Sequence, residues 1–554
     1  MVGPNGRVPV PPRKRFLITL EWSTMHLIGI VELRCIRRHI GNSPVCRVVC
    51  RVVDLQSAVV FTVWAFMSAS LLLYIARYGS NSPYYDGWTM VPLLDGTRHV
   101  NAEWLWEPRN DHRIPIPKLV LYGLYKLTRW DFRVGMFANA ILLSASALVL
   151  ILISAQLRGR VTYSDTFFPL VLTSWGHFEN LLWDWEITQV IPVAVVLFLL
   201  SQIVRSGIRL KRRDAILSSL GIVLLPFCGV PGLAYVPGFA LWLSAAGRYS
   251  WLKERRADRL IALFVWGLVT AAVLMIPLYF LGLKTSVGER KSIMTIASTI
   301  VAFLAHGFGP SVKVFLTLFY LLTIALFSLA LILVCWATQD KDLENRSRAW
   351  AMASFAFGFA GLCLSVGFAR PGWTFPPRYF LQAVPALCWA YFSFALFGQK
   401  RSSKRVLALL TLVAISAMLF NSSIGLNYAR ARAKDFREMK TDLLAGMPVQ
   451  ELVARHQRAV WPYPESGGAN WHEGLVASMK SLRRAGIGVF THLKEEPGFI
   501  ETPLDMLATL NSNDETGRWI WNFHKETFIA GLRIVPIQIR NNSHDPTLTQ
   551  KTDI

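Results

Sequence analysis

The chain has 554 residues, of which 53% are hydrophobic and only 17% are charged, and it contains 20 Trp and 33 Phe. Soluble proteins carry about a quarter charged residues and disordered chains have few aromatic residues, so both classes are excluded. The apolar residues form nearly uncharged blocks of about 16–25 residues, the length that a helix needs to cross roughly 30 Å of hydrocarbon. The composition therefore predicts a polytopic α-helical membrane protein.

The formal net charge of +23 would be typical of a nucleic-acid-binding protein if the chain were soluble. Here the basic residues gather between alternate apolar blocks, at 205–213, 248–259 and 400–405. Short loops rich in Lys and Arg stay on the cytoplasmic side of a membrane, so these clusters orient the helices. We therefore expect membrane lipid, and not nucleic acid, as a partner.

Residues 1–56 are basic and hold no apolar run long enough to span a membrane. Two interpretations stay open, a cytoplasmic arm on the membrane surface and a gene start placed too far upstream. From there we predict a transmembrane domain over residues 57–424, with a cytoplasmic N-terminus and eleven spans. The predicted spans are 57–76, 134–155, 166–182, 186–204, 215–229, 232–246, 260–282, 312–336, 349–367, 379–397 and 406–424.

This count places the basic clusters inside and places 77–133, 183–185, 283–311, 368–378 and 425–554 outside. Residues 292–309 are apolar enough for a twelfth span, but a span there would move the 400–405 cluster outside. We therefore predict that 292–309 is an interfacial helix on the outer face, and that 114–128 is another.

The tail at 425–554 is more polar than the rest of the chain. It shows a helical pattern over 436–453 and a candidate strand at 534–540. We predict a small exterior α+β domain there, which would be periplasmic in a bacterium.

Ionisable residues are concentrated in the first outer loop. Asp86 follows the first span closely, within YYDGW (84–88), and residues 104–114 read WLWEPRNDHRI. A carboxylate at the membrane–water boundary, walled by aromatic rings, can have a raised pKa and act as a general base. The alternative is a solvated loop whose charges pair with one another, and the sequence leaves both open.

A second group of acids lies between the third and fourth predicted spans, where residues 177–186 read HFENLLWDWE. Glu179, Asp184 and Glu186 have no basic residue near them in the sequence. Acids at such a depth are costly unless they face a cavity or a cation. The alternative is a hairpin turn that simply reaches water.

A third feature lies between the ninth and tenth predicted spans, where residues 370–379 read RPGWTFPPRY. The prolines stiffen a segment that carries Arg370 and Arg378. Arginine binds phosphate through paired N–H donors, so this segment is a candidate phosphate clamp, with a lipid head-group anchor as the alternative. No Walker-type glycine loop, HExxH motif or dinucleotide fingerprint is present, and we expect no metal and no cofactor.

Together these residues resemble the GT-C superfamily of membrane glycosyltransferases, over residues 57–425. An acid after the first span, followed by NDHRI (110–114) before an interfacial helix, is similar to the first outer loop of that family. FENLLW (178–183) and Arg378-Tyr379 are similar to later patches, and the nearest likeness is to bacterial family-39 and lipopolysaccharide-core sugar transferases. Many members carry two adjacent acids after the first span, whereas this chain has Asp86-Gly87.

The resemblance implies transfer of a hexosyl or pentosyl group from a polyprenyl-phosphate donor to an envelope glycan or lipid acceptor, with inversion, at the outer face of the bacterial inner membrane. It implies Asp86 as the base. The other implied roles are acceptor positioning or support of the base for Glu107, Asp111 and His112, donor-phosphate binding for Arg113, Arg370, Arg378 and Tyr379, and sugar-pocket lining for Glu179, Asn180 and Trp183.

Two other classes of protein remain as alternatives. A transporter or flippase for a lipid-linked sugar would place ionisable residues or broken helices near mid-membrane. A non-catalytic scaffold would use the exterior tail, but it gives no reason for carboxylates and arginines to recur on one side.

Overall fold

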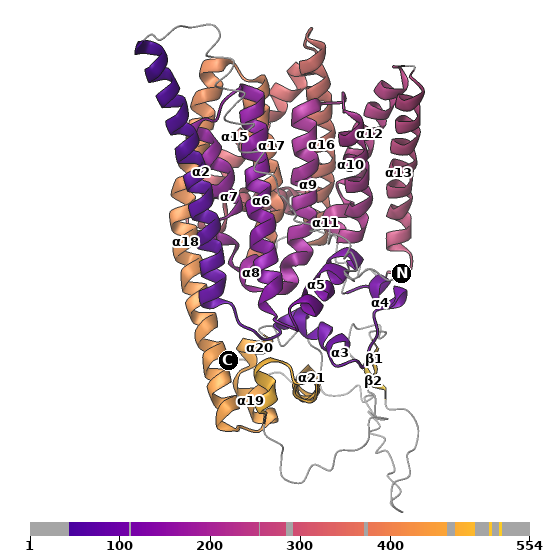
Figure 1. Ribbon diagram of the computed structural model, residues 1–554, viewed down its shortest axis with the longest axis vertical. Coiled ribbons are helices and arrows are strands. Elements are labelled where there is room, and N and C mark those ends of the chain that lie inside the picture. The colour runs from indigo at the N-terminus through magenta and orange to yellow at the C-terminus, as the bar shows by residue number, and fades with distance from the viewer. Residues whose placement is uncertain are drawn as a thin grey trace, which may run out of the picture.

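The computed structural model describes residues 44–109, 112–253, 255–283, 292–370, 375–461, 471–493, 509–511 and 520–522. Nine helices within these ranges are long and apolar enough to cross a membrane. They stand side by side as a bundle, and a group of short helices collects at its lower end (Figure 1). The chain is therefore a multi-pass α-helical membrane protein, as the composition predicts.

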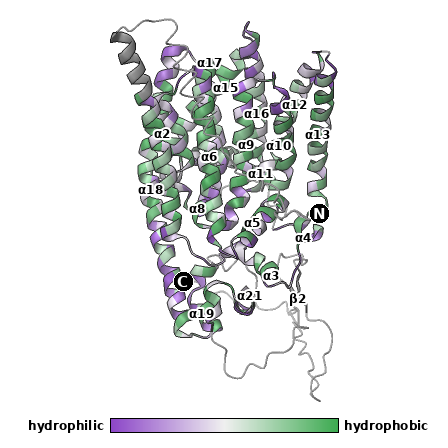
Figure 2. Cartoon of the chain, viewed as in Figure 1, coloured by the Kyte–Doolittle hydropathy of each residue, from purple (hydrophilic) through white to green (hydrophobic). Residues whose placement is uncertain are grey.

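The long helices are hydrophobic over most of their length, whereas hydrophilic residues gather at the lower end of α18 (Figure 2). Three of the spans include a short helix at their start, namely η4 (Asp184–Glu186), α11 (Val230–Leu233) and η8 (Pro377–Tyr379). The nine long helices are α2 (Pro44–Tyr78), α6 (Arg133–Arg158), α9 (Ile187–Ser206), α12 (Val236–Trp251), α13 (Arg256–Phe280), α15 (Leu316–Ala337), α16 (Leu343–Ala369), α17 (Phe380–Phe397) and α18 (Lys400–Ala445).

Two of the eleven predicted spans are not continuous long helices. The segment 166–182 is divided among η2 (Tyr163–Thr166), α7 (Phe167–Leu172), η3 (Trp175–His177) and α8 (Phe178–Leu182). The segment 215–229 forms α10 (Arg212–Leu224) and η5 (Leu225–Cys228), which ends at Gly229 with φ +90°. Hydropathy averages over such segments, and therefore does not register the turn residues that interrupt them.

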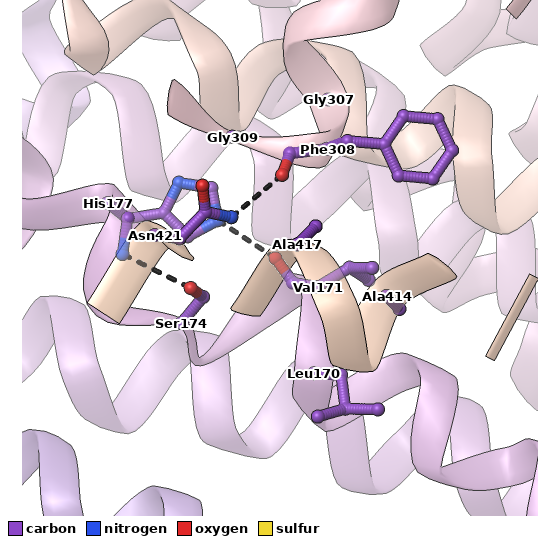
Figure 3. A pocket seen from close by; sticks show the side chains of 11 residues that line it. Leu170, Val171, Ser174, His177, Gly307, Phe308, Gly309, Ala414, Ala417 and Asn421 are labelled. Atoms are coloured by element: carbon purple, nitrogen blue, oxygen red, sulfur yellow. Dashed lines mark hydrogen bonds between the residues drawn. The ribbon is translucent and has the colours of Figure 1, made fainter. Parts of the chain in front are cut away.

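The predicted interfacial segment 292–309 forms α14 (Ile293–Ala305) and η6 (His306–Phe308), and η7 (Pro310–Lys313) follows Gly309 with φ +93°. Asn421 of α18 fastens this break, because its Nδ2 donates to Phe308 O at 2.8 Å and its Oδ1 accepts from Ser311 N at 2.8 Å. Figure 3 shows Asn421 beside His177, whose Nε2 bonds Val171 O at 2.8 Å. The small cavity beside these residues, of about 10 Å³, has room for a single water.

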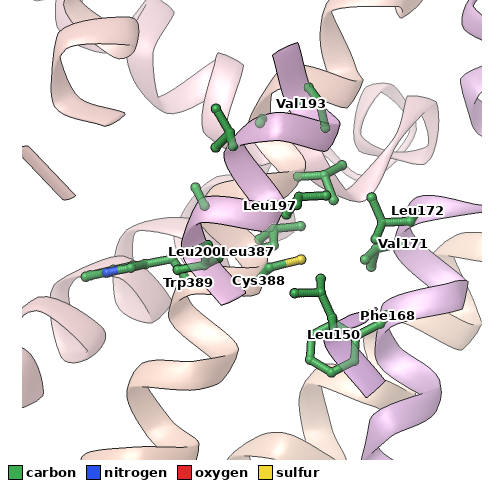
Figure 4. Close-up of a cluster of buried hydrophobic side chains, with 14 of the residues drawn as sticks. Leu150, Phe168, Val171, Leu172, Val193, Leu197, Leu200, Leu387, Cys388 and Trp389 are labelled. Carbon is green, nitrogen blue, oxygen red and sulfur yellow. The ribbon is translucent and has the colours of Figure 1, made fainter. Parts of the chain in front are cut away.

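The buried hydrophobic core of the bundle includes side chains from α6, α7, α9 and α17, and also from α2, α12, α16 and α18. Figure 4 shows Leu150, Phe168, Leu197 and Cys388 as members of this cluster. The outer helices instead expose apolar side chains, such as Leu274 of α13. Exposed leucines on a helix whose backbone is satisfied internally are what a lipid-facing surface requires.

At the lower end, the short helices of the first loop are η1 (Tyr85–Met90), α3 (Val91–Leu94), α4 (Ala102–Trp106) and α5 (Pro115–Leu127). The tail contributes α19 (Val449–Arg455), α20 (Gln457–Val460), α21 (Trp471–Arg484), η10 (Gly488–His492), and two antiparallel strands, β1 (Thr509–Asn511) and β2 (Ile520–Asn522), with Thr509 opposite Asn522.

The predicted helix at 114–128 is present as α5. The predicted boundary at 424/425 shows no break, because α18 continues through it to Ala445. The helical pattern at 436–453 is shared between α18 and α19. The candidate strand at 534–540 and residues 1–43 of the N-terminal arm lie outside the described residues.

Candidate functional site

The first loop, the segment after α8 and the extension of α18 meet in a second buried cluster at the lower end of the bundle (Figure 1). Trp88 joins the loop to the tail, because its Nε1 donates to Val460 O at 3.1 Å and its ring packs on Phe490. Large aromatic side chains dominate the cluster: Tyr84, Trp88, Trp104, Trp183, Trp185, Phe436, Trp461 and Phe490.

The acids of residues 177–186 lie inside the protein. Glu179 is 7% exposed, Asp184 is fully buried and Glu186 is 2% exposed, so the segment is not a hairpin that reaches water. Asp184 accepts a hydrogen bond from Tyr125 of α5, and Glu186 accepts one from Asn180 Nδ2 at 3.4 Å. Buried carboxylates in such numbers require hydrogen bonds or cations around them.

Asp86 lies in η1 and is 8% exposed. Arg109 Nε and Nη2 donate to Asp86 Oδ1 at 3.0 and 2.6 Å, and neither bond uses Oδ2. Gly87 brings η1 close to the buried acids, since a Cβ there would lie 3.6 Å from Asp184 Oδ1. The charges of the loop do pair, but the pair around Asp86 is inside the protein and next to the second group of acids.

The segment before α17 docks onto α8. The backbone N–H of Arg378 donates to Glu179 Oε2 at 3.1 Å, and Asn180 Nδ2 donates to Arg378 O at 3.2 Å. The Arg378 guanidinium carbon lies 5.6 Å from the ring centre of Trp183 and 5.4 Å from that of Tyr379. The structure thus brings together five of the predicted site residues: Glu179, Asn180, Trp183, Arg378 and Tyr379.

Arg432 of α18 is a member of this site that sequence reasoning missed. It is 6% exposed, and its guanidinium carbon lies 3.6 Å from the ring centre of Tyr84 and 5.2 Å from that of Phe436. None of its three nitrogens has a hydrogen-bond partner within the described part of the chain. Its charge is close enough to act on the carboxylates of Glu179 and Asp184.

Two predicted site residues lie in other surroundings. Glu107 is partly exposed and pairs with Arg98 at 2.7 Å. Arg113 is 6% exposed, and its guanidinium donates to the carbonyl oxygens of Tyr279, Trp106 and Leu281 at 3.0, 2.6 and 2.8 Å. In the structure Arg113 therefore fastens the first loop to the end of α13.

The remaining predicted residues are less closely described. Asp111 lies outside the described residues. His112 forms a backbone bridge with Arg109, so its position is tied to the ion pair of Asp86. Arg370 caps the end of α16.

Lys118 of α5 is hydrogen-bonded to the backbone of the first loop. It is 5% exposed, and its Nζ donates to Trp104 O at 2.9 Å and to Glu107 O at 2.8 Å. Burial lowers the pKa of Lys118 to about 8, against the opposing charge of Glu107.

Among the residues that the structure describes, no three His, Cys, Asp or Glu side chains gather as metal ligands would. Comparisons with protein-family models, curated proteins and solved structures find no match to the chain.

The site combines fixed cations, carboxylates and unsatisfied polar atoms. Asn180 Oδ1, Trp183 Nε1 and Asp184 Oδ1 are buried and have no hydrogen-bond partner in the described ranges. Buried polar atoms without partners are rare in proteins, and they indicate a position where a ligand or water supplies the bond. An anion with attached hydroxyl groups would satisfy both the cation of Arg432 and these atoms.

Proposed function

We propose that the chain transfers a sugar from a polyprenyl-phosphate donor to a glycan or lipid acceptor of the cell envelope. The observation that carries the proposal is the buried guanidinium of Arg432, without a hydrogen-bond partner among the described residues, beside buried carboxylates. The lower end of the bundle would then face the outside of a bacterial inner membrane, with the N-terminus cytoplasmic and the C-terminus periplasmic.

A buried cation without a partner costs several kcal/mol, and the rings of Tyr84 and Phe436 offset only about 2 kcal/mol of this by cation–π attraction. A ligand phosphate would remove the cost, because guanidinium groups bind phosphate oxygens through short charge-assisted hydrogen bonds. Arg378, 16% exposed at the same site, would supply a second cation. Lipid phosphates are the anions that reach such a position from the membrane.

Asp86 would act as the base. In the transfer, an acceptor hydroxyl oxygen attacks the anomeric carbon, and its proton passes to Asp86 Oδ2. The bond from that carbon to the phosphate oxygen breaks, and its electron pair leaves with the phosphate. Arg432 and Arg378 would stabilise the charge that develops there. Attack from the face opposite the phosphate inverts the anomeric carbon.

The sugar ring would lie against Trp183, which offers an apolar face. Asn180 Oδ1 and Asp184 Oδ1 would accept hydrogen bonds from sugar hydroxyl groups, because neither has another donor in the described part of the chain. Glu179 would act by holding Arg378 in place.

A transporter of lipid-linked sugars is the second candidate. The interrupted path from α7 to α8 and the break after α14 favour it, because transporters bind substrates at discontinuous helices. The cavity between these breaks, of about 10 Å³, is too small for a sugar. We therefore rank the transferase first.

The test is mass spectrometry of envelope glycolipids and polysaccharides from cells that lack the gene. The cells are complemented with the wild type, Arg432→Gln or Arg430→Gln, after checking that all three proteins insert equally. We expect one sugar to disappear, and to return with the wild type and Arg430→Gln but not with Arg432→Gln. Arg430 is the matched control, since it is exposed on the same helix. An unchanged glycan profile would overturn the proposal.

A further inference from the structure

A second polar cavity lies at the opposite end of the bundle, where α6, α9 and α17 end and α16 begins. Its volume is about 430 Å³. The cavity differs from the small one in Figure 3 in both size and chemistry. Its polar lining consists of three arginines, one carboxylate and three uncharged residues: Arg158, Arg205, Arg348, Glu344, Gln156, Asn345 and Ser154.

The arginines of this cavity are held by carboxylates. Arg158 pairs with the fully buried Asp165, and its Nη1 lies 3.2 Å from Tyr391 Oη. Arg205 pairs with Asp214. Neither acid lines the cavity, so the carboxylates orient the two guanidinium groups from behind its wall.

Arg348 is anchored differently. Its Nη2 lies 2.6 Å from Glu344 Oε1 and donates to Arg205 O at 3.3 Å. The Glu344 side chain is 57% exposed, so this partner is an exposed group that can turn into solvent. A surface ion pair of this kind is worth about 1 kcal/mol or less, and an incoming anion can replace it.

Several residues with hydrogen-bond donors line the cavity. Among them are the cationic side chains of Arg158, Arg205 and Arg348. Two amide side chains, Gln156 and Asn345, add further donors to the lining. Donors of this kind, on three arginines and two amides, suit an anion with several acceptor oxygens.

The size of the cavity indicates more than a bare ion. At about 30 Å³ for each water in the liquid, the volume holds roughly a dozen waters, more than one phosphate group needs. Leu157, Ala395 and Leu396 supply an apolar part of the lining, against which carbon atoms of a ligand can pack.

We propose that this cavity binds a phosphate ester. The ester is either the head group of an anionic phospholipid or a soluble phosphate ester from the same side of the membrane. The inference uses no residue of the candidate transferase site, and it stands whether or not that function is confirmed.

The test uses the full-length protein in nanodiscs of neutral phosphatidylcholine, with thermal unfolding as the readout. One arm adds phosphatidylglycerol to the discs, the second adds glycerol 3-phosphate to the buffer, and the third adds inorganic phosphate. The variants are Arg348→Gln, which keeps the buried pair of Arg158, and Lys404→Gln as an exposed basic control on α18. Each unfolding titration gives the binding constant of its probe.

If the lipid raises the melting temperature of the wild type and Lys404→Gln, and Arg348→Gln binds it about tenfold more weakly, the ligand is a lipid head group. The same pattern with glycerol 3-phosphate alone identifies a soluble ester. If only inorganic phosphate acts, or if Arg348→Gln and Lys404→Gln respond alike to every probe, the proposal is wrong. Arg432→Gln should keep the response, which separates this inference from the transferase proposal.

Discussion

The two ends of the bundle differ in whether their buried arginines have carboxylate partners. At the upper end, the three arginines that line the cavity each have a carboxylate partner, as in the pairs of Arg158 with Asp165 and Arg205 with Asp214. At the lower end, Arg432 is 6% exposed and has no hydrogen-bond partner among the described residues, although buried carboxylates lie nearby.

The difference distinguishes arginines that stabilise the fold from arginines that are available to bind a ligand. A paired arginine satisfies its carboxylate, so its loss leaves a buried charge behind and destabilises the protein. An arginine without such a partner carries a cost in the folded state, and its loss should affect function more than stability.

The largest difference in the rate of sugar transfer is expected between substitutions of two buried carboxylates, each of which pairs with one arginine. Asp86→Asn should lower sugar transfer about 10²–10⁴-fold, because the amide cannot take the proton of the acceptor. Asp258→Asn, which breaks the pair with Arg212 at the upper end, should leave transfer unchanged. Rates per folded protein, measured in nanodiscs with a lipid-linked sugar donor, check both. Full activity of Asp86→Asn would move the role of base to another carboxylate.

The second comparison is between arginine substitutions at the two ends of the bundle, in both activity and stability. Arg432→Met should lower transfer about 10²–10³-fold, as loss of a group that stabilises developing charge does. Its melting temperature should equal or exceed that of the wild type, because a buried unpaired cation is removed. Arg158→Met should instead unfold more easily by about 3–5 kcal/mol, since it leaves Asp165 buried and unpaired.

Arg430→Met, on the exposed face of α18, should change neither quantity. Calorimetric unfolding and transfer assays on the same preparations distinguish the outcomes. A large loss of stability in Arg432→Met would show that Arg432 holds the fold, and the contrast between the two ends would disappear.

A smaller effect is expected at Glu179, which positions Arg378 and does not touch the reacting atoms. Glu179→Gln keeps an acceptor for the Arg378 N–H but removes the charge that faces its guanidinium at 3.5 Å. We expect about a tenfold rise in KM for the donor with little change in kcat. Glu438→Gln, in an exposed pair with Lys434, is the control. A fall in kcat at unchanged KM would contradict a positioning role.

The membrane fold could largely be predicted from the sequence, because spans depend on long apolar runs. The prediction failed at 166–182 and 215–229, where few-residue breaks interrupt apolar segments. In the first of these, Gly425 of α18 packs directly on Trp175, where a Cβ would approach the Trp175 carbonyl oxygen to 2.2 Å. A contact between segments about 250 residues apart leaves no signal in a local hydropathy average.

Only the resemblance to a family placed Glu179, Asn180 and Arg378 in one site, because the two segments lie about 200 residues apart in the chain. Arg432 was missed because the run RARAK at 430–434 is typical of a solvated basic helix. The helical spacing could have indicated that Arg432 is buried, since Ala429, Arg432 and Phe436 share one face of the helix, and that face is buried. The pair of Asp86 with Arg109 could not be predicted, because the loop offered several arginines at similar distances along the chain.

The smallest expected effect concerns pH at the lower end. Burial lowers the pKa of Lys118 to about 8 from its ordinary value of 10.5, so between these values the unfolded chain binds more protons than the folded protein. The free energy of unfolding should therefore rise with pH from about 8 to 10, by at most about 3 kcal/mol.

Lys118→Met should remove this rise, whereas Lys126→Met, on the exposed face of the same helix, should keep it. Urea unfolding followed by tryptophan fluorescence at pH 7, 8, 9 and 10 measures the slopes. Parallel slopes for the wild type and Lys118→Met would mean that folding does not lower the pKa of Lys118. The arginine pairs of the upper end should contribute nothing in this range, because guanidinium groups stay charged well above pH 10. A rise confined to Lys118 would therefore assign the pH response to the first loop, the segment that carries Asp86.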